Sequence, residues 1–264
     1  MKLDDAQLKQ FRDDGYVILP ELFSADEVAV LKGEIPDIFA QRRDENFREK
    51  DGDTVRTAFA THNYNDVYAR FVRHPRILAP AEQMLDGQVY VHQFKLNAKA
   101  AFNGDVWQWH QDYGTWKRDD DMPTSNAMNL AVYLDDVNEF NGPLYLIPKS
   151  HKRGVLEAKH DLSTTSYPLW TLDEGLIREM VEDGGIVAPK GKAGTGFFFD
   201  SCLVHASPPN ISPWDRLIVY ISYNNVENAI REFNRAEWIA HRDFTPLKVE
   251  PDDCLLARSS AAAE

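Results

Sequence analysis

Three stretches in the first part of the chain carry apolar residues at the spacing of an amphipathic helix. They cover residues 4–12, 24–35 and 74–85. The middle stretch opens with Ser24-Ala-Asp-Glu27, the spacing of a capping box, in which the serine and glutamate side chains satisfy free backbone N–H groups. Tyr16–Leu19 has the apolar character of a short strand. We therefore expect residues 1–86 to form a largely helical N-terminal part.

From residue 88 onward, apolar and polar residues alternate with a period of two, which is typical of strands. The expected strands cover residues 88–99, 126–137, 144–147, 195–200 and 217–223, and a helix is expected at 172–182. Many short strands preceded by helices indicate a mainly β fold with flanking helices, namely a double-stranded β-helix (a cupin-like jelly roll). We expect a single domain, 1–264, with its jelly-roll core at 87–225 and a C-terminal extension at 226–264.

The strand at 88–99 places Val91, Gln93, Lys95 and Asn97 on one face. Polar residues that alternate through an apolar strand are typical either of a cavity wall or of an ordinary exposed sheet face. His92 would point to the opposite face, so we exclude it from a site on this wall.

Residues 41–61 break the pattern because they are mostly polar and charged. We interpret them as an exposed, mobile loop that closes over a substrate as a lid, because loop closure is a common way to gate a cavity. Arg56, near the end of this loop, is either a solvated residue or a clamp for a substrate carboxylate.

Composition narrows the choice of partners. The chain has 264 residues, of which 43% are hydrophobic, enough for a sizeable core. A net charge of −13 argues against nucleic acid and anionic membranes, and favours a small-molecule substrate. The two cysteines, Cys202 and Cys254, do not make a disulfide framework, and the N-terminus lacks the apolar run of a signal peptide. We expect a cytoplasmic monomer or homodimer.

The candidate chemistry lies in Trp107-Gln-Trp-His-Gln-Asp-Tyr113. On a strand edge, His110 and Asp112 would point the same way because side chains alternate. One imidazole and one carboxylate make two thirds of the two-histidine, one-carboxylate triad of non-haem iron oxygenases. An isolated pair of this kind is more often a surface pair. A downstream His205 as third ligand, followed by Arg216 as a carboxylate-binding fork, favours the iron site.

Four segments carry a resemblance to a known family. They are Trp109-His-Gln-Asp112, Asn141-Gly-Pro-Leu144, Ile147-Pro-Lys-Ser-His151, and His205-Ala-Ser207 with Arg216. In these residues the chain resembles the phytanoyl-CoA dioxygenase family of Fe(II)- and 2-oxoglutarate-dependent oxygenases, over nearly its whole length. The resemblance implies an enzyme that uses Fe(II), 2-oxoglutarate and O2, with ascorbate as a stimulant. Such an enzyme couples hydroxylation to the decarboxylation of 2-oxoglutarate to succinate and CO2.

The resemblance also implies roles for individual residues. The metal ligands would be His110, Asp112 and His205, and the residues around 2-oxoglutarate would be Arg216, Ser207, Asn129 and Asn97. The substrate residues would be Gln93, Lys95, Trp116, Phe199 and Tyr220, with Arg56 as our own addition. Halogenases of this fold carry Gly or Ala in place of the carboxylate, so Asp112 favours hydroxylation. We interpret His151 and His160 as surface or structural residues and Cys202 as a buried thiol.

Two bacterial branches of the family look close. The resemblance to free L-proline 4-hydroxylases lies in Glu49-Lys-Asp-Gly52, Thr54-Val-Arg56 and Gly104-Asp-Val-Trp107, and that to ectoine hydroxylases in Met122-Pro123 and Gly114-Thr-Trp116. We therefore expect a hydroxylase of a small free amino acid, with 4-hydroxylation of L-proline as the first candidate. Ectoine, another cyclic amino acid or a natural-product intermediate are alternative substrates. A non-catalytic jelly-roll protein that binds metal is the alternative from another class.

Overall fold

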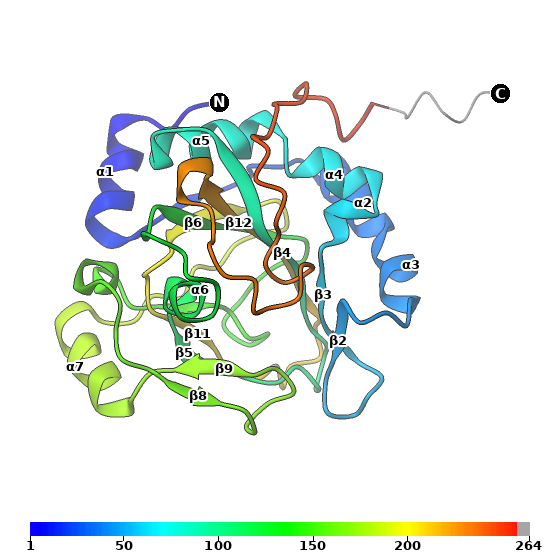
Figure 1. The fold of residues 1–264 in the computed structure, drawn as a ribbon. Coiled ribbons are helices and arrows are strands. Elements are labelled where there is room, and N and C mark those ends of the chain that lie inside the picture. Colours follow the sequence, from blue (N-terminus) through cyan, green and yellow to red (C-terminus); the bar gives the residue numbers. More distant parts are fainter. Residues whose placement is uncertain (258–264) are drawn as a thin grey trace.

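The computed structural model describes residues 1–257, which are built around a seven-stranded antiparallel sheet of order β1-β10-β6-β12-β4-β3-β2 (Figure 1). A three-stranded sheet of order β5-β11-β7 and a hairpin, β8-β9, complete the strands. The strands are β1 (Tyr16–Leu19), β2 (Asn46–Arg48), β3 (Val55–Phe59), β4 (Val89–Lys99), β5 (Trp107–His110), β6 (Ala127–Tyr133), β7 (Tyr145–Leu146), β8 (Lys159–Asp161), β9 (Leu169–Thr171), β10 (Gly196–Asp200), β11 (His205–Ser207) and β12 (Arg216–Asn225). The α-helices are α1 (Asp5–Asp14), α2 (Ala25–Gly33), α3 (Ile35–Ala40), α4 (Asp66–Phe71), α5 (Pro75–Leu85), α6 (Asp112–Asp120) and α7 (Glu174–Gly184).

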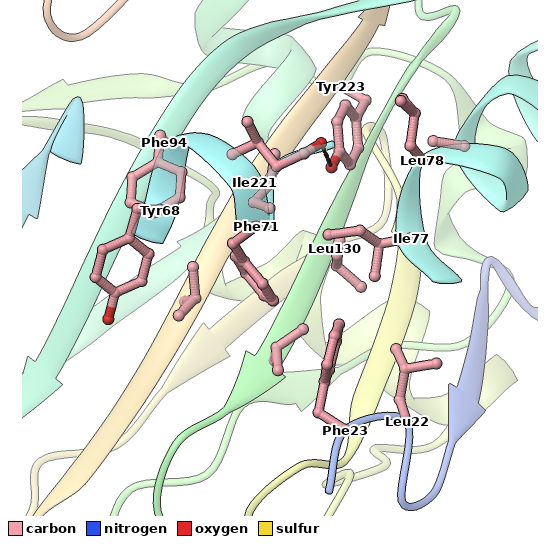
Figure 2. Close-up of a cluster of buried hydrophobic side chains, with 14 of the residues drawn as sticks. Leu22, Phe23, Tyr68, Phe71, Ile77, Leu78, Phe94, Leu130, Ile221 and Tyr223 are labelled. Carbon is pink, nitrogen blue, oxygen red and sulfur yellow. Dashed lines mark hydrogen bonds between the residues drawn. The ribbon is translucent and has the colours of Figure 1, made fainter. Parts of the chain in front are cut away.

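The hydrophobic core lies between the large sheet and the helices that cover one of its faces (Figure 2). Phe71 of α4 and Ile77 of α5 belong to the same buried cluster as Leu130 of β6 and Ile221 of β12. Burial of one such side chain contributes roughly 1.5–3 kcal/mol, so this cluster fixes the sheet firmly. Because strand side chains alternate, Asn129 points from β6 to the opposite face, where it lines a cavity.

Most of the expected elements are present. Helices α1, α2 and α5 lie where the apolar spacing predicted them, and Ser24 makes the expected capping box of α2. Pro36 lies in the first turn of α3, where a missing N–H costs little, so the chain breaks between α2 and α3. The strands predicted from residue 88 onward form β4, β6, β7, β10 and β12. The mainly β, jelly-roll fold with flanking helices is confirmed.

The prediction of an exposed loop at residues 41–61 is wrong. This segment contains β2 and β3, which pair with each other, and β3 also pairs with β4. All five residues of Val55–Phe59 are buried. The polar residues were misleading because Glu49 and Arg56 are buried as an ion pair, with 3.1 Å between Oε2 and Nη1. The sheet therefore takes three of its strands from the part of the chain that was expected to be largely helical.

Two strands each contain one extra residue, a β-bulge, that the alternation of the sequence does not reveal. The extra residue is Arg56 in β3, opposite β2, and His92 in β4, opposite β12. A bulge of this kind redirects neighbouring side chains. Val91 consequently joins the hydrophobic core instead of sharing a face with Gln93. The imidazole of His92 packs against the indole of Trp116, with ring centroids 4.9 Å apart.

The last part of the chain is irregular but well anchored. Beyond a short 3-10 turn after β12, it runs beside β4, where the backbone N–H groups of His241 and Leu247 donate to the carbonyls of His92 and Val89, each at 2.9 Å. The segment before α7, expected to be irregular, contains the β8-β9 hairpin. Among the residues described, no helix combines the length and the apolar character that a membrane span requires.

Candidate active site

Three potential metal ligands meet at the junction of β5, α6 and β11. His110 ends β5, Asp112 begins α6, and His205 begins β11 directly opposite His110. His110 Nε2 lies 3.8 Å from Asp112 Oδ1, and His205 Nε2 lies 3.5 Å from Asp112 Oδ2. One ligand atom from each residue lies within 4.8 Å of the others. The two ligands of the H-x-D motif therefore meet at a strand-to-helix junction, and not along one strand edge as expected.

Both histidines are oriented for metal binding by their own backbone. His110 Nδ1 donates to the carbonyl of Gln108 at 2.6 Å, and His205 Nδ1 donates to the carbonyl of Leu203 at 2.9 Å. With the proton on Nδ1, the lone pair of each Nε2 faces the cluster. Burial lowers the pKa of His110 to about 3, so the neutral ring that a metal requires is the stable form.

Asp112 is held in place by a chain of buried polar groups. Asn129 Nδ2 donates to Asp112 Oδ2 at 2.9 Å, and Ser222 Oγ donates to Asn129 Oδ1 at 2.6 Å. Burial alone would raise the pKa of Asp112, but the opposing positive charge, with Lys95 as its largest source, lowers this pKa. A carboxylate that remains ionised beside two neutral imidazoles suits a divalent cation. The position of Asn129 makes it an orienting residue for Asp112, and its expected contact with 2-oxoglutarate stays a prediction.

A cavity of about 260 Å³ opens in front of these three residues. Gln93, Lys95 and Asn97 of β4 form one wall, so the strand face is a cavity wall and not the exposed sheet face that the alternation also allowed. Gln93 and Asn97 are four steps apart along the strand, so this wall is about 13 Å long. The cavity is also lined by the predicted residues Trp116, Asn129, Phe199, Ser207 and Tyr220.

Arg216 lies behind the Asn97 end of this wall. Its Nη2 donates to Asn97 Oδ1 at 2.6 Å, and Asn97 Nδ2 donates to Thr57 Oγ1 at 3.1 Å. Only 1% of Arg216 is exposed, yet its Nε and Nη1 find no hydrogen-bond partner among residues 1–257. A buried guanidinium with unused donors calls for an anion, because an unsatisfied buried charge is costly. The residues at this end therefore fit the distal carboxylate of 2-oxoglutarate.

A second arginine, which sequence analysis missed, lines the cavity at the Gln93 end. Arg235 comes from the irregular segment after β12, and its Nε donates to Asp120 Oδ1 at 2.9 Å, while Nη2 bonds Oδ2. Gln93 Nε2 donates to the carbonyl of Ile239 in the same segment at 3.0 Å. No local motif marks Arg235, because its importance arises from contacts with residues far away along the chain.

Aromatic rings close the remaining sides of the cavity. Tyr167, in the loop between β8 and β9, packs against Phe47 and Trp107, with ring centroids 5.3 Å apart in both pairs. His160, interpreted as a surface or structural residue, also lines the cavity and stacks on Trp170 at 4.6 Å. These residues were missed because residues 150–171 gave no regular pattern, although their aromatic content was a usable signal.

Arg56 does not line the cavity. Its guanidinium is paired with Glu49, donates to the carbonyl of Val106 and lies 4.1 Å from the centre of the Trp107 ring. With only 1% of the residue exposed, Arg56 is neither a solvated residue nor a clamp at the cavity wall. Cys202 is a buried thiol, as expected, and burial raises its pKa to about 12.

Comparisons with known proteins agree with this geometry. The family model described as Phytanoyl-CoA dioxygenase (PhyH) matches residues 11–218. The chain is 37% identical over 236 residues to the ectoine dioxygenase of Bordetella parapertussis, covering 85% of this chain and 76% of that protein. It is 34% identical over 253 residues to the L-proline trans-4-hydroxylase of Streptomyces griseoviridis, covering 92% of this chain and 94% of that protein.

A solved structure is similar over nearly the whole chain. The crystal structure of EctD from S. alaskensis with 2-oxoglutarate and 5-hydroxyectoine has a TM-score of 0.85 and 34% sequence identity. The match covers 94% of this chain and 87% of that one. Another crystal structure of the same protein contains bound Fe. These similarities exclude the non-catalytic alternative. The chain belongs to the phytanoyl-CoA dioxygenase family and is an Fe(II)- and 2-oxoglutarate-dependent dioxygenase.

Proposed function

We propose that this enzyme hydroxylates a small cyclic zwitterion that carries a carboxylate, with L-proline and ectoine as the two leading candidates. The observation that carries this proposal is the pair of arginines beside the β4 wall of the cavity. Arg216 lies behind Asn97 and Arg235 lies near Gln93, at opposite ends of the same strand wall. One arginine suits the co-substrate dicarboxylate, which leaves the other for the carboxylate of a second molecule.

Iron bound at His110, Asp112 and His205 would supply the activation of O2 and the oxidation of 2-oxoglutarate. The chain supplies binding and orientation. Arg216 anchors the distal carboxylate of 2-oxoglutarate, with Ser207 as a neighbouring hydroxyl on the cavity wall.

Arg235 is well suited to hold the substrate. Its fork is already fixed by Asp120, a carboxylate with no exposed surface, so little side-chain entropy is lost when a ligand binds. Lys95, on the wall between the two arginines, faces Asp112, which partly offsets the lowering of its pKa by burial. Its amine would compensate negative charge brought in by either ligand.

The walls favour a compact ring over an extended chain. Trp116 and Phe199 are each 1% exposed, and Tyr220 is also buried, so the inner surface is rigid and apolar. Aromatic faces also attract a cationic nitrogen, such as the ring nitrogen of a zwitterion. A cavity of about 260 Å³ has no room for coenzyme A in addition to 2-oxoglutarate.

Different features of the chain favour the two candidate substrates. The segments around Glu49, Arg56 and Trp107 resemble L-proline 4-hydroxylases, and Trp107 lines the cavity. The segment around Trp116, which also lines the cavity, resembles ectoine hydroxylases, and the similarity to EctD supports that substrate. L-Proline 4-hydroxylation stays our first candidate and ectoine hydroxylation the second.

Succinate formation with a panel of candidate substrates tests the proposal. The purified protein would be incubated with Fe(II), ascorbate, 2-oxoglutarate and, separately, L-proline, ectoine, pipecolate or an acyclic amino acid. We expect succinate production to rise with a cyclic zwitterion and a product one oxygen heavier to appear by mass spectrometry. The His110→Ala variant should form neither. Stimulation by the acyclic amino acids alone would refute the choice of a cyclic substrate.

A further inference from the structure

Lys99, the last residue of β4, ties together the two strands that carry the metal-binding histidines. Its Nζ donates to the carbonyl of Pro208 at 2.7 Å and also to the carbonyl of Asp105. Asp105 lies just before β5, which ends in His110, and Pro208 lies just after β11, which begins with His205. A single buried amine therefore joins the entry of one metal-bearing strand to the exit of the other.

The surrounding backbone is shaped around this side chain. A Cβ at Gly104 would lie 2.7 Å from Lys99 Cβ, and a Cβ at Gly142 would lie 2.7 Å from Lys99 Cδ. Gly142 also has a φ of +76°, which favours glycine. Lys99 is 1% exposed. The Lys99 side chain therefore lies in a narrow buried channel beside Gly104 and Gly142, and not in a surface groove.

Lys99 belongs to a group of buried cations with too little negative charge to balance it. It lies directly opposite Arg216 in the β4–β12 pairing, so the two side chains leave the same face of the sheet. Arg56 is close enough to interact with both, and all three residues are 1% exposed. The carboxylates that face the group are Glu49, already paired with Arg56, and the half-buried Asp105.

This excess of positive charge favours the neutral amine. Burial, together with Arg216 and Arg56, lowers the pKa of Lys99 to about 6, against the opposing effect of Glu49 and Asp105. At neutral pH, Lys99 without a neighbouring anion is therefore mostly uncharged. An incoming dianion beside Arg216 would reverse the balance, because an opposite charge favours the ammonium form.

We propose that Lys99 takes up a proton from solvent when 2-oxoglutarate binds beside Arg216, and that the resulting ammonium positions the two metal-bearing strands around the co-substrate. The proposal rests on the proposed role of Arg216 and is independent of the identity of the substrate. No bond of 2-oxoglutarate changes in this step. The added charge strengthens the hydrogen bonds from Nζ to Asp105 and Pro208, since charge-assisted bonds are stronger than neutral ones.

Proton uptake makes the affinity for 2-oxoglutarate depend on pH in a defined direction. Below the pKa of about 6, Lys99 is already protonated, so binding requires no further proton. Above it, each molecule of 2-oxoglutarate must bring one proton into the site. Linkage then weakens binding by up to about tenfold per pH unit, until the pH exceeds the pKa of Lys99 in the complex.

Calorimetry under anaerobic conditions can count these protons. The Fe(II)-loaded enzyme would be titrated with 2-oxoglutarate in buffers of different ionisation enthalpy, at about pH 8 and about pH 5.5, on either side of the pKa of about 6. The wild-type enzyme should take up close to one proton at the higher pH and few at the lower pH. Lys99→Met should bind 2-oxoglutarate without proton uptake. Lys192→Met, at an exposed lysine, is the matched control and should retain uptake, and Lys95→Met tests the other buried lysine directly.

The outcomes separate this inference from the proposed function. If the wild type binds 2-oxoglutarate without proton uptake at the higher pH, the inference is wrong while the co-substrate assignment stands. If uptake disappears in Lys95→Met and persists in Lys99→Met, the proton belongs to the other lysine and the inference is again wrong. If the wild type does not bind 2-oxoglutarate, both the inference and the assignment fall. The wild-type measurements are informative even if Lys99→Met does not fold.

Discussion

Arg235 and Asp120 form a buried ion pair that connects the irregular C-terminal segment to helix α6, whose first residue is the proposed metal ligand Asp112. The backbone N–H groups of Arg231 and Glu232 also donate to the Asp120 carbonyl, at 3.1 and 3.0 Å. Helix α6 thus carries a metal ligand at one end and the support of the proposed substrate anchor at the other. With Arg235 as substrate anchor and Asp112 as metal ligand, as proposed, one short helix would set the distance between the substrate and the metal.

Replacing Arg235 with Met should impair substrate binding selectively. The KM for the amino-acid substrate should rise about a hundredfold, because a charge-assisted fork to a carboxylate is lost, while the KM for 2-oxoglutarate should change little. Steady-state kinetics with each compound varied in turn measures both. Asp120 would be left without a partner, so the double variant with Asp120→Leu should recover stability and not substrate affinity. Equal changes in the two KM values would contradict the assignment of Arg235.

Removing the support of Asp112 should weaken metal binding. Asn129→Ala deletes the hydrogen bond to Asp112 Oδ2, and loss of such an orienting partner typically lowers metal affinity about 10- to 100-fold. Ser222→Ala is the matched control, since it removes only the outer bond to Asn129 and should have a smaller effect. Competition with a metal chelator gives the affinities. Unchanged metal affinity in Asn129→Ala would show that Asp112 needs no such support.

Arg216 should determine the affinity for 2-oxoglutarate. Arg216→Lys keeps the charge and loses the fork, whereas Arg216→Met loses both, so the KM for 2-oxoglutarate should rise in that order, by about a hundredfold or more for Met. The exposed Arg42→Met serves as a matched control and should leave this KM unchanged. A normal KM in Arg216→Met would place the distal carboxylate elsewhere.

Acid should destabilise the protein partly through buried neutral histidines. Burial lowers the pKa of His241 from 6.5 to about 4, so between these pH values the unfolded chain binds more protons than the native one. The contribution of His241 to the unfolding free energy is therefore fully present above pH 6.5 and is lost as the pH falls toward 4. The loss should be on the order of 3 kcal/mol.

Denaturant unfolding over this pH range, with wild type and His241→Phe compared, measures the contribution. The variant keeps a ring against His62, where the present centroids are 4.8 Å apart. Histidines far from His241 are common to both proteins and cancel in the comparison, whereas His62 and His92, whose pKa values are lowered by burial and partly by His241, add to the difference between the curves. The unfolding free energy of His241→Phe should fall less steeply with acid, and parallel curves would contradict the prediction.

The features that could be predicted from sequence are those carried by short, local spacing. The two-residue spacing of His110 and Asp112 in the sequence, with His205 and Arg216 further along, was enough to indicate a metal site beside an arginine that binds a carboxylate. The alternation of β4 was enough to put Gln93, Lys95 and Asn97 on one face, which in the structure lines the cavity. These predictions agree with the structure because each depends only on a few residues close in the sequence and on the regular geometry of strands.

The features that could not be predicted depend on contacts between distant segments. Glu49 and Arg56 look like loop residues until the fold buries them against each other. The bulge at His92 changes which side chains share a face, and no local residue pattern requires it. Arg235 and Tyr167 reach the cavity from irregular segments, so periodicity gave no reason to choose them.

The central claim is that this chain transfers one oxygen atom from O2 to a small cyclic zwitterion while 2-oxoglutarate becomes succinate. The most direct measurement uses isotopically labelled O2 with Fe(II), 2-oxoglutarate and L-proline or ectoine, followed by mass spectrometry of both products. We expect one labelled oxygen in the hydroxylated product and one in succinate, formed in equal amounts. Succinate formed without any labelled hydroxylated product from either compound, even at saturating concentration, would contradict the proposed substrate class.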